Sequence, residues 1–225
     1  MWCVPELTDE YVERMEDVLR LYARPRNARE PVVCLDERPV VLHDSARTGT
    51  PMRPGTIAKK DYEYVRRGTA NVFCIVEPAT GRRLTRATRD RKGRTFAGEL
   101  KRIASGYAKA RKIDLVMDNL STHSEKSLTA RYGDVAGRAL WKRFRVHFTP
   151  RHGSWLNAAE IEASLVSREC LGARRIGDLN TLRREVTSWR RAASAAGRVI
   201  DWRFRVADAR RVFRYSGIVT TRSEY

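Results

Sequence analysis

The chain has 225 residues, and 42% of them are hydrophobic, which allows one substantial buried core and excludes a globally disordered protein. Its 45 basic residues, 8 Lys and 37 Arg, exceed its 27 acidic residues, so the net charge is +18. Because Arg grips phosphate with a planar fork, this charge indicates a polyanionic partner, of which nucleic acid is the usual one. The alternative is an Arg-rich surface that is merely solvated.

The cysteines and the hydropathy pattern bear on the compartment. None of the four cysteines forms a CxxC pair or a cluster with zinc-ligand spacing, so reduced thiols are expected; they are Cys3, Cys34, Cys74 and Cys170. No apolar stretch approaches the length of a membrane span, and the N-terminus lacks the pattern of a signal peptide. We therefore expect a cytoplasmic protein with no membrane partner.

The first 30 residues are acidic, unlike the rest, with five Arg against seven Asp or Glu. Thr8 fits the N-cap of a helix whose first turn is acidic, and apolar residues then recur at helical spacing as far as Tyr22. Pro25 ends this pattern. Residues 1–30 are therefore predicted to form a helical linker.

Strands are predicted where apolar or β-branched residues run together between turn residues. The runs at 32–36 and 71–76 read as buried strands, and residues 82–88 read as a partner strand after a turn. Residues 44–62 contain several Gly and Pro and are predicted to form a basic loop.

The second half alternates helices and strands. A helix capped by Thr95 leads to a strand at 113–118, and the remaining predictions are helix 124–132, strand 145–148, helix 157–169 and a last helix from Asp178. This order predicts a mixed α/β fold with a five-stranded sheet and helices on both faces. We expect one catalytic domain at 31–175, followed by a basic helical extension packed on it at 176–225.

Three carboxylates lie at predicted element boundaries. Asp36 and Asp118 end two apolar runs, and Glu160 begins a helix, so all three can meet at one edge of the sheet. Crowded carboxylates repel one another, and bound Mg²⁺ removes that conflict. Two ions about 4 Å apart can activate an attacking oxygen and stabilise a leaving oxygen of a phosphodiester. The plainer alternative is that each Asp forms a turn and that Glu160 completes a capping box.

Polar residues near these acids are candidates for supporting roles. Asn119 follows Asp118 and could order the loop, and His123 could approach a phosphate or a water. The alternative is that both are ordinary turn and surface residues. Asn157 is predicted to cap the helix that carries Glu160 at its third position, and Glu162 is a less favoured metal ligand.

Basic residues are expected to bind DNA phosphates, although the alternative is solvated loop charge. The candidates are Arg47, Arg53, Lys59, Lys60, Arg66, Arg67, Arg151 and His152.

Four ordered motifs resemble bacterial insertion-sequence transposases of the IS-six-thirty/mariner family. They are Cys34-Leu35-Asp36-Glu37, the stretch from Arg67 to Phe73, Met117-Asp118-Asn119 with His123, and the stretch from Thr149 to Asn157 with Glu160. The resemblance covers roughly residues 2–213. It implies a ribonuclease-H-like fold and an Asp-Asp-Glu triad formed by Asp36, Asp118 and Glu160.

The resemblance also implies a function. It implies metal-dependent cleavage at the ends of a mobile element and strand transfer into target DNA, with two Mg²⁺ ions, or Mn²⁺, as cofactors. A homodimer on DNA and a location at the bacterial nucleoid are expected. Relatives usually carry helix-turn-helix modules before the catalytic part, and this sequence shows none. A non-catalytic DNA-binding remnant and a cellular nuclease of the same fold stay open as alternatives.

Overall fold

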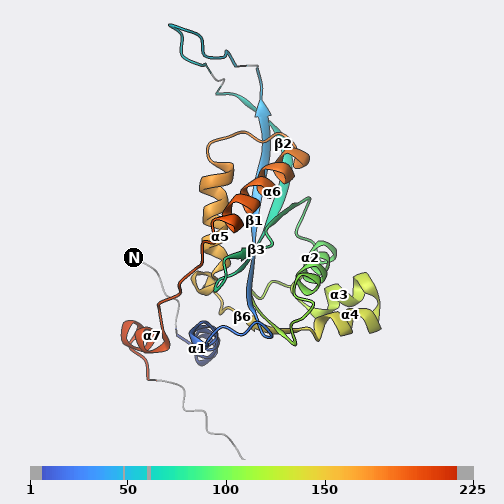
Figure 1. Ribbon diagram of the computed structural model, residues 1–225, viewed down its shortest axis with the longest axis vertical. Helices are drawn as coiled ribbons and strands as arrows, with labels where there is room; N and C mark the ends of the chain where they lie inside the picture. Colours follow the sequence, from blue (N-terminus) through green and yellow to red (C-terminus); the bar gives the residue numbers. More distant parts are fainter. Residues whose placement is uncertain (1–6, 48, 60–61, 217–225) are drawn as a thin grey trace, which may run out of the picture.

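A mixed six-stranded sheet forms the centre of the protein (Figure 1). The computed structural model describes residues 7–47, 49–59 and 62–216. The strand order is β3-β2-β1-β5-β6, with β4 also paired to β2. The strands are β1 (Val32–Ser45), β2 (Tyr64–Glu77), β3 (Arg82–Arg83), β4 (Arg86–Thr88), β5 (Ile113–Met117) and β6 (Phe144–Phe148). The pair β1–β2 is antiparallel, whereas β1, β5 and β6 run parallel.

The sheet has six strands rather than the predicted five, because residues 82–88 form two short strands instead of one. The hydroxyl of Thr85 accepts a hydrogen bond from the backbone N–H of Ile75 at 3.1 Å. The side chain of Thr85 thus accepts the hydrogen bond that a backbone carbonyl accepts in a regular sheet. The pairing with β2 is therefore interrupted between β3 and β4.

Strand β1 is much longer than the predicted strand at 32–36, which places Asp36 inside the strand rather than at its end. The β1–β2 ladder runs from Cys34 opposite Val76 to Ser45 opposite Tyr64, with one irregularity after Leu42. In its outer part Val40 and Leu42 are buried, whereas the side chains of β2 from Tyr64 to Thr69 are exposed. In Figure 1 this hairpin projects beyond the body of the molecule.

Helices cover both faces of the sheet, as predicted. One face carries α2 (Gly93–Gly106), α3 (Glu125–Tyr132) and α4 (Asp134–Trp141), which share a core with β1, β2 and β5. The other face carries α1 (Asp9–Ala23), α5 (Ala159–Leu165), the π-helical segment η2 (Val166–Leu171), α6 (Leu179–Ala195) and α7 (Val206–Phe213). Among the described residues, no helix is both long and apolar enough to cross a lipid bilayer.

The predicted helix starts are right in part. Thr8 caps α1 and Asp178 caps α6, each through its side-chain oxygen. Thr95 does not cap α2, which begins two residues earlier at Gly93; its hydroxyl donates to the carboxylate of Asp90 instead. The predicted helix at 157–169 starts at Ala159 and changes to π-helical geometry at Val166.

A buried ion pair joins α5 to the edge of the sheet. Arg83 Nε donates to Glu162 Oε2 at 3.0 Å, and the side chains are 1% and 0% exposed. Arg83 Nη1 donates to the carbonyls of Gly81 and Arg198 at 2.7 and 3.0 Å, and to the carbonyl of Ala193 at 3.4 Å. A buried charge requires this degree of pairing. Glu162 is therefore structural, in line with its lower ranking as a metal ligand.

Candidate active site

Asp36 lies in β1 on the face that α5 covers. Side chains alternate along a strand, so Asp36 shares the face of Cys34, whereas Leu35 and Glu37 point to the α2 side. One oxygen of Asp36, Oδ1, accepts a hydrogen bond from the backbone N–H of Glu37 at 2.7 Å.

Asp118 and Glu160 reach the same region from two other elements. Asp118 follows the last residue of β5, as predicted, and its side chain is 48% exposed. Glu160 is the second residue of α5 and is exposed. The carboxylates of Glu160 and Asp118 both act to raise the pKa of Asp36, so these three acids from separate elements lie close enough to interact.

Asn157 holds the start of α5 against β1. The N-cap residue is Ala158, not Asn157 as predicted, so the capping-box alternative for Glu160 is wrong. Instead, Asn157 Nδ2 donates to the carbonyl of Leu35 at 2.8 Å, and Oδ1 accepts from the N–H of Ala159 at 3.1 Å. The parallel β1–β5 ladder ends at Cys34, so Asn157 takes the next carbonyl along the strand, beside Asp36.

The surroundings of Asp36 oppose the ionisation of its carboxyl group. Burial raises the pKa of Asp36 to about 7, and although the N–H of Glu37 opposes this, the carboxylates of Glu160, Glu37 and Asp118 add to it. Crowded carboxylates resist ionisation together, and a bound divalent cation reverses that preference.

His123 is buried, so the alternative of a surface residue is wrong. Its ring stacks on Phe96 with centroids 4.5 Å apart. Nδ1 lies 2.6 Å from Asp118 Oδ1, and Nε2 lies 2.8 Å from Glu37 Oε1. Burial acts to lower the pKa of His123, but its hydrogen bonds to Asp118 and Glu37 outweigh burial and raise it to about 10. Nε2 thus faces the carboxylate of Glu37, whereas Nδ1 faces both the carboxylate of Asp118 and its backbone carbonyl, 3.1 Å away.

Two residues near Asp118 were not predicted from the sequence. Burial acts to raise the pKa of Asp118, but the bond and charge of His123, the N–H of Leu120 and the charge of Arg91 together lower it. Arg91 precedes α2 and carries no local motif. Glu37 adjoins Asp36 in sequence, and strand alternation alone could have placed it on the opposite face.

A groove of about 800 Å³ adjoins Asp118 and contains part of the predicted DNA-binding set. Asp118, Asn119, Arg151 and His152 line it together with the first turns of α1. His152 has a φ of +62°, a backbone conformation that is uncommon for non-glycine residues and recurs at functional sites.

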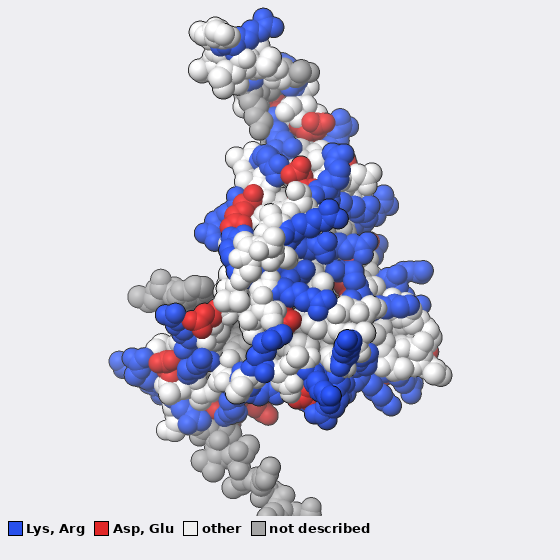
Figure 2. Space-filling view, viewed as in Figure 1, with Lys and Arg blue, Asp and Glu red and all other residues white. Residues whose placement is uncertain are grey.

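The other predicted DNA-binding residues lie on the projecting hairpin. Arg47, Arg53 and Lys59 are exposed near its tip, and Arg66 and Arg67 are exposed on β2. Lys60 lies outside the described residues. Figure 2 shows Lys and Arg covering much of one face of the molecule, from this hairpin down past α6, with few acidic residues among them.

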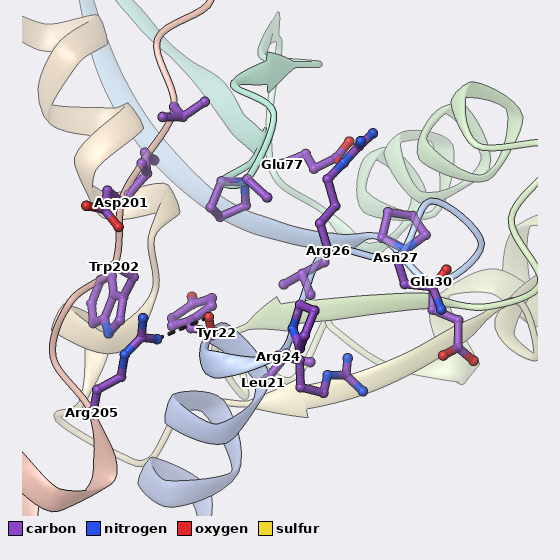
Figure 3. A pocket seen from close by; sticks show the side chains of 17 residues that line it. Leu21, Tyr22, Arg24, Arg26, Asn27, Glu30, Glu77, Asp201, Trp202 and Arg205 are labelled. Atoms are coloured by element: carbon purple, nitrogen blue, oxygen red, sulfur yellow. Dashed lines mark hydrogen bonds and ion pairs between the residues drawn. The ribbon is translucent and has the colours of Figure 1, made fainter.

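A second cavity, of about 590 Å³, lies at the amino end of β1, between the end of α1 and residues 199–205 (Figure 3). Three arginines line it, but each already has a partner: Arg24 pairs with Asp114, Arg26 faces Glu77, and Arg205 donates to the carbonyl of Tyr22. This cavity offers no acid cluster and is not a candidate active site.

The architecture is that of a ribonuclease-H-like fold: a mixed sheet with an antiparallel β1–β2 hairpin, parallel β5 and β6, and helices on both faces. Residues 31–183 match the family model described as DDE superfamily endonuclease. The chain therefore belongs to the DDE superfamily endonuclease family, as its motifs indicated. No curated protein matches the sequence.

Solved structures of similar fold come from the Mos1 transposase. The Mos1 mariner paired end complex with Mn is 16% identical, with a TM-score of 0.53 over 88% of this chain and 61% of that one. The Mos1 Strand Transfer Complex is 16% identical, with a TM-score of 0.53 over 85% of this chain and 57% of that one. The Mos1 paired end complex with Mg is 14% identical, with a TM-score of 0.53 over 85% and 58%. This chain thus spans about three fifths of the length of those proteins.

Proposed function

We propose that the protein is a DDE transposase that cleaves DNA at the ends of a mobile element and joins them to target DNA. The observation that carries this proposal is the electrostatic coupling of Asp36, Asp118 and Glu160, which come from β1, the end of β5 and the start of α5. Membership of the DDE endonuclease family supports the same conclusion.

The donor set fits divalent cations such as Mg²⁺ or Mn²⁺. All three side chains offer hard carboxylate oxygens, and those of Asp118 and Glu160 are open to solvent, so room for water and phosphate remains. Two such ions, when bound, supply an activated water and neutralise charge on the leaving oxygen. In this proposal Asp36 would serve both ions, while Asp118 and Glu160 would each complete one site.

The other residues of the site position DNA. Arg151 and His152 line the groove beside Asp118 and bind the phosphates of the strand that enters it. Arg91 adds positive charge close to Asp118. On the hairpin, the exposed basic residues hold the flanking duplex; they are Arg47, Arg53, Lys59, Arg66 and Arg67, together with Lys60 outside the described residues.

Further parts of the proposal concern assembly. Cutting two element ends in one reaction suits a homodimer on DNA, and the complexes of the Mos1 protein include paired end and strand transfer forms. The protein would meet its DNA at the bacterial nucleoid. In this proposal residues 1–30 are a helical linker before the catalytic domain at 31–175, and residues 176–225 are a basic helical extension packed on it.

The test is cleavage of DNA that carries the inverted repeats flanking the gene, with Mg²⁺ or Mn²⁺. Asp118→Asn and Glu160→Gln should abolish cleavage and retain DNA binding, whereas Glu185→Gln, an acid on α6 outside the site, should change neither. Retained cleavage in either site variant would contradict the assignment. Wild-type protein that binds but never cuts would identify a remnant, and cleavage of RNA–DNA hybrids without strand transfer would identify a cellular nuclease.

A further inference from the structure

A buried imidazole connects Asp118 to the opposite face of β1. Glu37 follows Asp36 along the strand but points to the α2 side, where its side chain is only 2% exposed. The His123 ring lies between Glu37 and Asp118. Its Nε2 is 2.8 Å from Glu37 Oε1, and its Nδ1 is 2.6 Å from Asp118 Oδ1. Phe96 of α2 stacks on the ring and fixes its plane.

These three side chains could be mistaken for a metal site, because their ligand atoms lie within 4.8 Å of one another. One imidazole offers a single nitrogen to an ion, however, and here each nitrogen faces a different carboxylate. The arrangement is instead a bridge of acid, imidazole and acid.

We propose that Glu37 is a positioning residue for Asp118 and acts through the His123 ring. This inference rests on the proposed function, in which Asp118 holds a divalent cation. The Asp118 side chain is half exposed and follows the last strand residue, and its contacts with the ring and with the backbone N–H of Leu120 restrict its rotamer. The ring in turn is held by Glu37 and Phe96.

The bridge matters because metal ligands depend on the groups that orient them. Losing an outer partner of a ligand typically weakens metal binding about 10- to 100-fold. Glu37→Gln keeps the side-chain volume and an acceptor for the ring but removes a negative charge. The weaker anchor and the absent charge both lower cation affinity, so their effects have the same sign.

The chain contains a matched control. His147 on β6 is also buried between two acids, with Nδ1 2.6 Å from Asp17 Oδ2 and Nε2 3.2 Å from Asp114 Oδ1. Asp17 belongs to α1 and Asp114 to β5, and neither contributes to the pKa of Asp36. Asp17→Asn therefore makes the same carboxylate-to-amide change beside an imidazole, outside the acid cluster.

The experiment is a Mn²⁺ titration of the full chain without DNA, with free and bound ion distinguished by electron paramagnetic resonance. Asp118→Asn should remove the site. Glu37→Gln should weaken it about 10-fold, whereas Asp17→Asn should leave the affinity unchanged. Unfolding curves of all variants verify that each is folded under the titration conditions.

The outcomes separate this inference from the proposed function. Wild-type affinity in Glu37→Gln, with the site removed in Asp118→Asn, overturns the positioning role alone. A wild-type protein with no Asp118-dependent Mn²⁺ site overturns the proposed function, and the inference with it. If Glu37→Gln does not fold, Glu37→Asp replaces it: this variant keeps the charge but withdraws the carboxylate from the ring, so it should also bind more weakly, and unchanged affinity would overturn the inference.

Discussion

Replacing Asn157 with Ala tests whether the acid cluster depends on the tether between α5 and β1. The side chain is 2% exposed and makes two hydrogen bonds, to the carbonyl of Leu35 and from the N–H of Ala159. Asn157→Ala removes both partners and leaves two backbone groups buried without them. It also frees the turn that sets the distance from Asp36 to Glu160.

The expected cost follows from these hydrogen bonds. A buried donor or acceptor left without a partner costs about 1–3 kcal/mol. Both backbone groups lie at buried positions, so the two losses together should lower the free energy of unfolding by about 2–4 kcal/mol. Metal-dependent cleavage should fall as well, at temperatures where the variant is still folded, because Glu160 lies one helical turn beyond the missing tether.

Urea unfolding followed by circular dichroism measures the first effect, and cleavage of a short duplex measures the second. Asn27→Ala is the control, since the Asn27 side chain makes one exposed hydrogen bond to a neighbouring N–H. Asn157→Asp should be at least as damaging as Asn157→Ala, because it turns a carboxylate oxygen towards the carbonyl of Leu35. A destabilisation no larger than that of Asn27→Ala, with normal cleavage, would refute this reasoning.

Three further predictions concern pH, salt and backbone. Burial acts to lower the pKa of His147, but hydrogen bonds to two carboxylates raise it from 6.5 to about 9. The stability that the charged ring contributes is therefore fully present below pH 6.5 and is lost as the pH rises through 9. In urea unfolding, the free energies of wild type and His147→Gln should differ by on the order of 1–2 kcal/mol below pH 6.5, and the difference should vanish above pH 9. Replacing Arg66 or Arg67 with Gln should reduce the slope of log affinity for DNA against log salt by about 1 if that arginine binds one phosphate, and an unchanged slope would exclude the residue from the interface. Gly81→Ala should lower the midpoint of thermal unfolding and reduce the free energy of unfolding by about 2–4 kcal/mol. Gly81 has a φ of +67°, and an added Cβ would lie 2.3 Å from the carbonyl oxygen of Arg198. A variant as stable as wild type would show that this turn relaxes freely.

The parts of the fold that follow local rules could be predicted from the sequence. The caps of α1 and α6 and the buried strand β5 depend on neighbours a few residues away, so composition and spacing identify them. The outer half of β1 was not predicted, because Glu37, Arg38 and Pro39 interrupt the apolar run and pairing with the distant β2 carries the strand past them. For this reason the sequence pattern alone puts Asp36 at a strand end.

The site shows the same division. Residue type and family motifs predict the three acids as a site, and the charges of Glu160 and Asp118 both act on the pKa of Asp36. The hydrogen bonds of Asn157 with Leu35 and of His123 with Glu37 join residues more than 80 positions apart. Local rules treat the first as a cap and the second as a surface residue, because sequence spacing carries no information on such distant partners.

The buried Arg83 has a consequence for how the protein can be divided. Two of the carbonyls that receive its guanidinium belong to Ala193 and Arg198, well beyond the predicted end of the catalytic domain at residue 175. A fragment cut there would leave a cation in the interior with half of its acceptors missing, next to the helix that bears Glu160. The smallest piece that folds on its own should therefore extend past Arg198, because residues up to that position complete the surroundings of the buried guanidinium.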